Sequence, residues 1–187
     1  KDNLISIKKE IQEINPNSQL IVVTKTFGMS KIEPLIEFGH RHFGENKVQE
    51  ALEKWSDVKI NNKNLKLHLI GKLQTNKVKY AVKIFDFIHS VDSEKLAKKI
   101  SEEQQKQKKK VKIFIQVNIG DEQQKTGVSK SSVTHLYSYC KTLDLDVVGL
   151  MCIPPLEKSS DTFFKEMNIL NTNLNFNELS MGMSSDY

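Results

Sequence analysis

Gln19-Leu-Ile-Val-Val-Thr24 is a short β-branched run without polar alternation, and Lys25 follows it directly. Such a run is typical of a strand covered on both faces, as in a parallel sheet. A lysine that ends a buried strand loses hydration, and this favours its neutral, nucleophilic form. We therefore expect Lys25 to be sequestered and able to attack a carbonyl carbon. The alternative is an ordinary lysine that extends past the strand end into solvent.

Helical and strand-like segments alternate along the rest of the chain. Apolar residues three or four apart predict a helix over residues 3–14, and residues 31–38 form a second predicted helix with Pro34 in its first turn. Short apolar runs predict six further strands, at residues 41–44, 65–71, 85–91, 111–118, 146–153 and 178–183. The segments between them predict helices at residues 46–55, 75–83, 93–108, 131–143 and 159–173.

This alternation predicts a parallel sheet with helical crossovers, which is either an open doubly wound sheet or a (β/α) barrel. No Gly-x-Gly-x-x-Gly turn follows the first strand, so the dinucleotide-binding fingerprint is absent. A length of 187 residues with 38% hydrophobic content indicates a single domain over residues 1–187. The pattern alone does not choose between the two kinds of sheet.

Composition and charge narrow the class of protein. The net charge is +5, and the basic stretch at residues 106–112 lacks the interleaved aromatic residues that stack on bases, so we interpret it as a solvated face and expect no nucleic-acid partner. No apolar run is long enough to span a membrane. Cys140 and Cys152 fit neither a disulfide framework nor a close metal-ligand pair, which favours free thiols and a cytoplasmic setting.

Polar residues that close the predicted strands are the first candidates for a site, because parallel α/β domains bind ligands at the carboxyl ends of their strands. They are Lys25, Glu45 with Asn46, His68 with Gly71, Gln74 and Asn76, His89 with Asp92, Gln116 with Asn118, residues 151–155 and residues 180–184. The two histidines are predicted to be interior residues, and no spacing suggests a zinc site. The turn around Gly182 is suited to hold a phosphate through amides and hydroxyls, with a helix cap as the alternative.

Six segments, in order along nearly the whole chain, resemble the pyridoxal phosphate (PLP) homeostasis proteins. They are Val22-Val-Thr-Lys-Thr26, His42-Phe-Gly-Glu-Asn46 with Val48-Gln-Glu50, His68-Leu-Ile-Gly-Lys-Leu-Gln-Thr-Asn-Lys77, Gln116-Val-Asn-Ile119 with Lys125-Thr-Gly127, Gly149-Leu-Met151 with Ile153-Pro154, and Leu179-Ser-Met-Gly-Met-Ser184. The resemblance implies a TIM-type (β/α)₈ barrel like the cofactor-binding domain of alanine racemase.

The resemblance also implies a cofactor and roles for residues. Lys25 matches the lysine that carries PLP as a Schiff base, and Ser184 matches a serine on the cofactor phosphate. The other matching positions lie around the cofactor pocket: Asn46, His68, Ser180, Met181 and Met183. The implied function is PLP binding in vitamin B6 homeostasis without catalytic turnover, in a monomer that delivers the cofactor to PLP-dependent apoenzymes.

One departure from the family pattern bears on the fold. Family members continue after the Ser-Met-Gly-Met-Ser motif to a strand with Arg-x-Gly-Thr, whereas this sequence ends at Tyr187. We therefore expect the last βα unit to be missing, the barrel to stay open and its sheet edges to be exposed.

Two enzymatic alternatives remain. One is a PLP-dependent amino-acid racemase or decarboxylase. The other is an aldolase-like barrel in which Lys25 attacks a sugar-phosphate carbonyl.

Overall fold

The computed structural model describes residues 2–122, 124, 126–155 and 159–183. Within these ranges one parallel sheet has its strands in the order β1-β2-β3-β4-β5-β6-β7. The strands are β1 (Val22–Val23), β2 (His42–Glu45), β3 (Lys66–Leu69), β4 (Phe87–Val91), β5 (Lys112–Gln116), β6 (Asp146–Met151) and β7 (Glu178–Ser180). All seven predicted strands are present.

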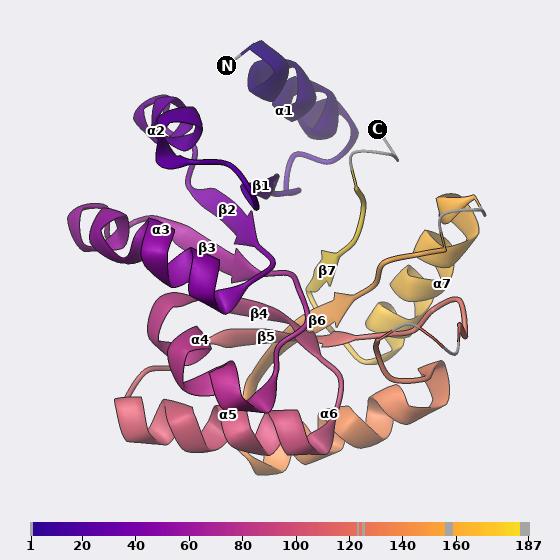
Figure 1. The fold of residues 1–187 in the computed structure, drawn as a ribbon. Coiled ribbons are helices and arrows are strands. Elements are labelled where there is room, and N and C mark those ends of the chain that lie inside the picture. Colours follow the sequence, from indigo (N-terminus) through magenta and orange to yellow (C-terminus); the bar gives the residue numbers. More distant parts are fainter. Residues whose placement is uncertain (1, 123, 125, 156–158, 184–187) are drawn as a thin grey trace.

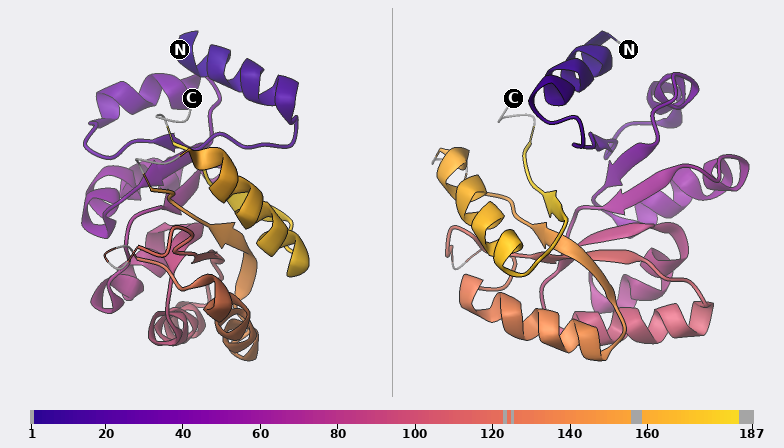
Figure 2. Two further views of the ribbon diagram at one scale, coloured as in Figure 1. Left: turned by 90° about the vertical axis from the view of Figure 1, so that its right-hand side faces the viewer. Right: turned by 180° about the vertical axis from the view of Figure 1, so that it is seen from behind.

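The strand order decides between the two predicted sheets. A doubly wound sheet reverses its order at a switch point, whereas in a barrel each strand pairs with the next along the chain. Here every pair is consecutive and parallel. The sheet curls with its helices on the outside and stays open between β1 and β7, as Figures 1 and 2 show. The described residues thus form a partial (β/α) barrel, as expected.

Helices connect successive strands and cover the convex face of the sheet (Figure 1). They are α2 (Met29–Glu37), α3 (Val48–Asn61), α4 (Val78–Ile84), α5 (Glu94–Gln107), α6 (Val133–Thr142) and α7 (Ser160–Asn173), with short 3₁₀ turns η1 (Thr75–Lys77) and η2 (Lys130–Ser132). The first helix, α1 (Asp2–Ile14), precedes β1. None of the helices in the described ranges combines the length and apolar character that crossing a membrane requires.

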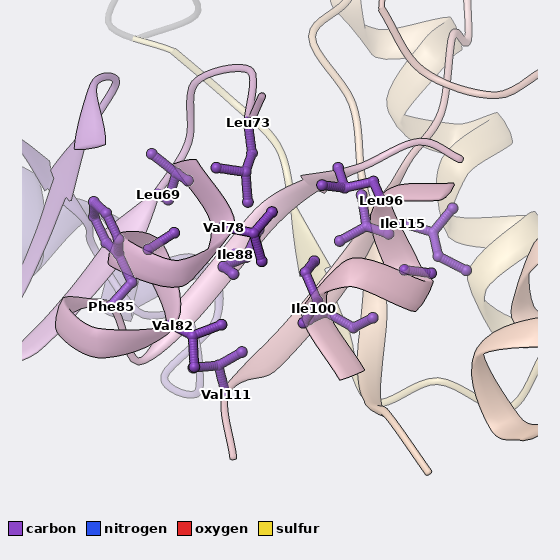
Figure 3. Packing of buried hydrophobic residues seen from close by; sticks show 14 of the residues in the cluster. Leu69, Leu73, Val78, Val82, Phe85, Ile88, Leu96, Ile100, Val111 and Ile115 are labelled. Atoms are coloured by element: carbon purple, nitrogen blue, oxygen red, sulfur yellow. The ribbon is translucent and has the colours of Figure 1, made fainter. Parts of the chain in front are cut away.

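The main core lies between the sheet and its outer helices. Figure 3 shows Leu69 of β3 and Ile88 of β4 packed with Val78 and Val82 of α4 and with Ile100 of α5. All five side chains are almost completely buried. Burial of a side chain of this size contributes about 1.5–3 kcal/mol, so this layer holds α4 and α5 against β3 and β4.

Three local predictions need correction. β1 is a two-residue edge strand whose Val23 is 40% exposed, so it is not covered on both faces as the apolar run indicated. Pro34 lies in the interior of α2, not in its first turn, because the helix begins at Met29. The carbonyl that Pro34 leaves unpaired within the helix belongs to Ser30, which is exposed to water.

The basic stretch at residues 106–112 is only partly a solvated face. Lys108 ends α5 in the left-handed conformation, as helix C-caps commonly do. Lys109 Nζ donates to the carbonyl oxygens of Lys83 at 2.9 Å and Phe85 at 2.8 Å, at the end of α4. Burial, followed by the nearby Lys59, lowers the pKa of Lys109 to about 8. This lysine is therefore a structural cap of the neighbouring helix.

Candidate functional site

The residues at the carboxyl ends of β1 and β2 divide between the two faces of the sheet. Thr24 Oγ1 donates to Glu45 Oε1 at 2.7 Å, and Trp55 Nε1 of α3 donates to the same oxygen at 2.9 Å, so Thr24 and Glu45 face the outer helices. Because successive strand residues face opposite sides, Lys25 and Asn46 belong to the inner, concave face. Lys25 and Asn46 each come two residues after the last pair of β1 with β2, which is Val23 with Gly44.

Lys25 itself is exposed to solvent at the open side of the sheet. The expectation that a covered strand end would sequester this amine is therefore wrong. The reason is the edge position of β1, which pairs with β2 alone. Because the amine is exposed, a dissolved carbonyl compound can reach it directly. What the surrounding residues determine is the position of the amine.

Three charged residues on the outer, helix-covered side of the sheet form a hydrogen-bonded network that reaches the backbone on both sides of Lys25. Lys54 Nζ donates to Thr24 O at 2.8 Å, to Glu45 Oε1 at 2.9 Å and to Glu50 Oε1 at 3.0 Å. Glu50 Oε1 also accepts from the backbone amide of Thr26 at 2.7 Å. We call these three charged residues the Glu45–Glu50–Lys54 cluster. It is a network of charged hydrogen bonds that ends on the two residues flanking Lys25.

The electrostatics of this cluster favour its charged form. Burial acts to lower the pKa of Lys54, but its hydrogen bonds to Glu45 and Glu50 outweigh burial and raise that pKa above its ordinary value. The hydrogen bond from Lys54, followed by the one from the Thr26 amide, lowers the pKa of Glu50. Lys54 and Glu50 therefore stay ionised, and their hydrogen bond stays intact, across the neutral pH range.

The inner face of the sheet carries a chain of hydrogen-bonded histidines. His42 Nδ1 lies 3.1 Å from His68 Nε2, His68 Nδ1 lies 2.9 Å from His89 Nε2, and His89 Nδ1 lies 2.7 Å from Ser180 Oγ. We call these four residues the histidine chain. It links β2, β3, β4 and β7, and so connects the second strand to the last one across the concave side of the sheet.

Burial keeps the histidine chain neutral. It lowers the pKa of His68 to about 2, with the neighbouring His89 adding to the effect, and the pKa of His89 to about 3. Burial also lowers the pKa of His42, with Lys66 as the next cause. A neutral imidazole has one donor and one acceptor nitrogen, so the hydrogen bonds must all run in one direction along the chain.

The prediction that His68 and His89 are interior histidines is confirmed, since both are at most 4% exposed. His68 lies within β3, where its ring stacks on Phe87 with centroids 4.3 Å apart. Both of its ring nitrogens are used by other histidines. Because Phe87 covers one face of the ring, only the carbon edge and the other face remain for contact with a ligand.

The end of β7 carries the remaining predicted pocket residues. Ser180 is half-buried and fixed by His89, whereas Met181 is 40% exposed and follows the strand. Gly182 has φ 89, a left-handed conformation that glycine adopts without strain, and Met183 comes directly after it. The predicted phosphate residue Ser184 lies outside the described residues.

Two other groups of predicted site residues have structural roles. Gln116 Nε2 donates to Thr126 Oγ1 at 3.0 Å, and Asn118 Nδ2 donates to Glu122 O at 2.8 Å, so both side chains hold the loop after β5. Gly71 lies under Asn46, because a Cβ at position 71 would be 2.2 Å from the Asn46 carbonyl oxygen. This glycine lets the end of β2 pass closely over the end of β3.

Sequence reasoning missed Lys54 and His42. Lys54 lies four residues after Glu50 on α3, and this spacing indicates an ordinary surface ion pair on a helix. The contact of Lys54 with the loop after β1 exists only in the folded structure, because the two segments are far apart in the sequence. His42 begins β2, and the sequence singled it out only as the first residue of the segment His42-Phe-Gly-Glu-Asn46.

Comparisons with known proteins define the class. Residues 1–187 match the family described as "Alanine racemase, N-terminal domain". Alanine racemase from Clostridium difficile has a TM-score of 0.70 at 17% identity over 96% of this chain and 49% of that chain, which is a likeness of fold. The sheet and this match together define an α/β barrel domain of the alanine racemase type.

Relatives with higher identity define the family within this class. The Pyridoxal phosphate homeostasis protein of Aquifex aeolicus is 36% identical over 180 residues, which cover 91% of this chain and 78% of the relative. PipY of Synechococcus elongatus has a TM-score of 0.85 without PLP, at 34% identity over 99% of this chain and 89% of that chain. Its structure with PLP bound has a TM-score of 0.82, at 31% identity over 96% of this chain and 90% of that chain. The chain belongs to the pyridoxal phosphate homeostasis protein family.

Proposed function

We propose that this protein binds PLP as a Schiff base on Lys25 and takes part in PLP homeostasis. One observation carries the assignment: an accessible amine stands at the carboxyl end of β1, and hydrogen bonds fix the residues on both sides of it. A Schiff base requires a neutral amine within reach of an aldehyde. The PLP-bound structure of PipY, at 31% identity, supports the same cofactor here.

The residues around Lys25 fit this cofactor. Asn46 is half-buried and directly follows β2, the strand that pairs with β1, so it is available to contact the ring substituents. His68, on the next strand, offers its ring edge, since its nitrogens are already paired. Across the opening between β1 and β7, Ser180 and Met181 begin a turn. We assign this turn, together with Met183 and Ser184, to the phosphate of the cofactor. When bound, PLP supplies an electrophilic aldehyde and an electron sink.

We further propose that the protein holds the cofactor without turning over a substrate. A racemase needs an acid–base group on each face of the substrate α-carbon. The tyrosines of the described residues, at positions 80, 137 and 139, lie on the outer helices α4 and α6. The buried histidines have their nitrogens engaged with one another and with Ser180. These contacts favour a carrier over a racemase or decarboxylase.

The proposed partners are PLP-dependent apoenzymes, which would receive the cofactor by exchange of a reversible Schiff base. The proposed state is a monomer. Cys140 and Cys152 are both buried, and we propose a cytoplasmic location, where thiols remain reduced.

A titration with PLP tests the assignment. The wild-type protein should develop the visible absorbance of a PLP Schiff base at neutral pH, and Lys25→Ala should not. Lys31→Ala, which removes an exposed lysine of α2, is the matched control and should bind as the wild type does. Equal absorbance from Lys25→Ala and the wild type would refute the assignment.

A further inference from the structure

Lys54 makes an unusual set of contacts for a helix-surface lysine. Its three ammonium donors are all used, by Thr24 O, Glu45 Oε1 and Glu50 Oε1. Its side chain is only 9% exposed and that of Glu45 is fully buried. A buried ion cluster of this kind gives little net stability, because the loss of hydration offsets the attraction between the charges. Its placement therefore needs another explanation.

The explanation lies in what the cluster holds. The Thr24 carbonyl belongs to the peptide group before the Lys25 Cα, and the Thr26 amide belongs to the peptide group after it. Lys54 binds the first at 2.8 Å and Glu50 binds the second at 2.7 Å. With both peptide groups fixed, the direction of the Lys25 Cα–Cβ bond is fixed as well.

The local backbone needs this support. Thr26 has φ 67, a left-handed conformation that a β-branched residue rarely adopts. Such strain persists only where surrounding contacts impose it. The hydrogen bond from the Thr26 amide to Glu50 is such a contact. Without it, the loop would relax and the exposed Lys25 would lose its defined position.

We propose that Lys54, through Glu45 and Glu50, is a positioning residue that holds Lys25 for Schiff-base formation; this inference rests on the proposed function. In that step the Lys25 nitrogen bonds to the aldehyde carbon. The aldehyde oxygen leaves as water with the two protons of the neutral amine. An amine that must be ordered when the cofactor binds loses about tenfold in affinity for each 1.4 kcal/mol of ordering cost. Loss of Lys54 should therefore weaken Schiff-base formation by about 10- to 100-fold.

Lys59 provides a matched control on the same helix. Its ammonium donates to the Ile84 carbonyl at 2.8 Å and to the Asp86 carboxylate. It thus makes the same kind of contact as Lys54, but to the α4–β4 connection at the amino end of the sheet. Lys59→Met should destabilise the fold to a similar extent and leave Schiff-base formation unchanged.

The experiment compares wild type, Lys54→Met and Lys59→Met in PLP titrations followed by visible absorbance from pH 6 to pH 9. Lys54→Met should bind about 10- to 100-fold more weakly. No such weakening is expected in Lys59→Met. Hydrogen exchange at the Thr26 amide should become faster in Lys54→Met alone.

Equal binding in Lys54→Met and Lys59→Met would overturn the inference. If Lys54→Met does not fold, Glu50→Ala serves instead, since Glu50 is 28% exposed and its loss frees only the Thr26 side of the loop. That variant should bind several-fold more weakly, and wild-type binding would overturn the inference. A wild-type protein that forms no adduct on Lys25 would refute the proposed function itself, which is a distinct result.

Discussion

Mild acid is expected to destabilise this fold through its buried histidines. In the unfolded chain a histidine titrates near 6.5, whereas burial lowers the pKa of His68 to about 2 and that of His89 to about 3. Between these values the unfolded state binds more protons than the folded state, so stability is complete above pH 6.5 and falls as the pH falls. At pH 5 each of these two histidines lowers the free energy of unfolding by about 2 kcal/mol, which is about 4 kcal/mol for the pair.

That loss is a large part of the total, since domains of this size are stable by about 5–15 kcal/mol. Urea unfolding at pH 7.5, 6 and 5 measures it, with Trp55 as the reporter because it is the single tryptophan and is 1% exposed. His89→Gln should remove about 2 kcal/mol of the loss at pH 5, whatever it does to stability at pH 7.5. His135→Gln, on the surface of α6, should leave the loss unchanged. A wild-type unfolding free energy that is equal at pH 7.5 and pH 5 would refute the reasoning.

Three further predictions concern stability and reactivity. Gly71→Ala should lower the unfolding free energy by about 1–3 kcal/mol, because the new Cβ would be 2.2 Å from the Asn46 carbonyl oxygen; Gly28→Ala, with open space around it, is the control in the same thermal melts. Ser180→Ala should lower the free energy of unfolding, measured in urea, by about 1–3 kcal/mol, because it leaves the buried Nδ1 of His89 unpaired. Burial raises the pKa of the Cys140 thiol to about 12, so iodoacetamide at pH 8 should label it only in urea; rapid labelling of the folded protein would contradict this.

The element pattern was predictable because it depends on local spacing. All seven strands occur where apolar runs predicted them, although several are shorter; for example, β3 spans Lys66–Leu69 within a predicted strand at residues 65–71. The barrel followed from the resemblance and not from the pattern. Consecutive strand order is a property of tertiary pairing, which apolar periodicity does not specify.

The candidate site was predictable in its residues but not in its environment. The sequence placed Lys25, Asn46 and His68 at strand ends, and in the structure Lys25 and Asn46 directly follow the region where β1 pairs with β2, while His68 lies within β3. The sequence could not show that β1 is an exposed edge strand, because an edge strand and a covered strand can have the same apolar run. Nor could it show that Lys54, distant in sequence, holds the loop around Lys25, since that contact exists only after α3 packs on the sheet.

Chemical trapping tests the central claim most directly. The wild-type protein is incubated with PLP, reduced with borohydride, digested and mapped by mass spectrometry. We predict one dominant phosphopyridoxyl adduct, on the peptide that contains Lys25. A dominant adduct on any other lysine, or no adduct at all, would contradict the account.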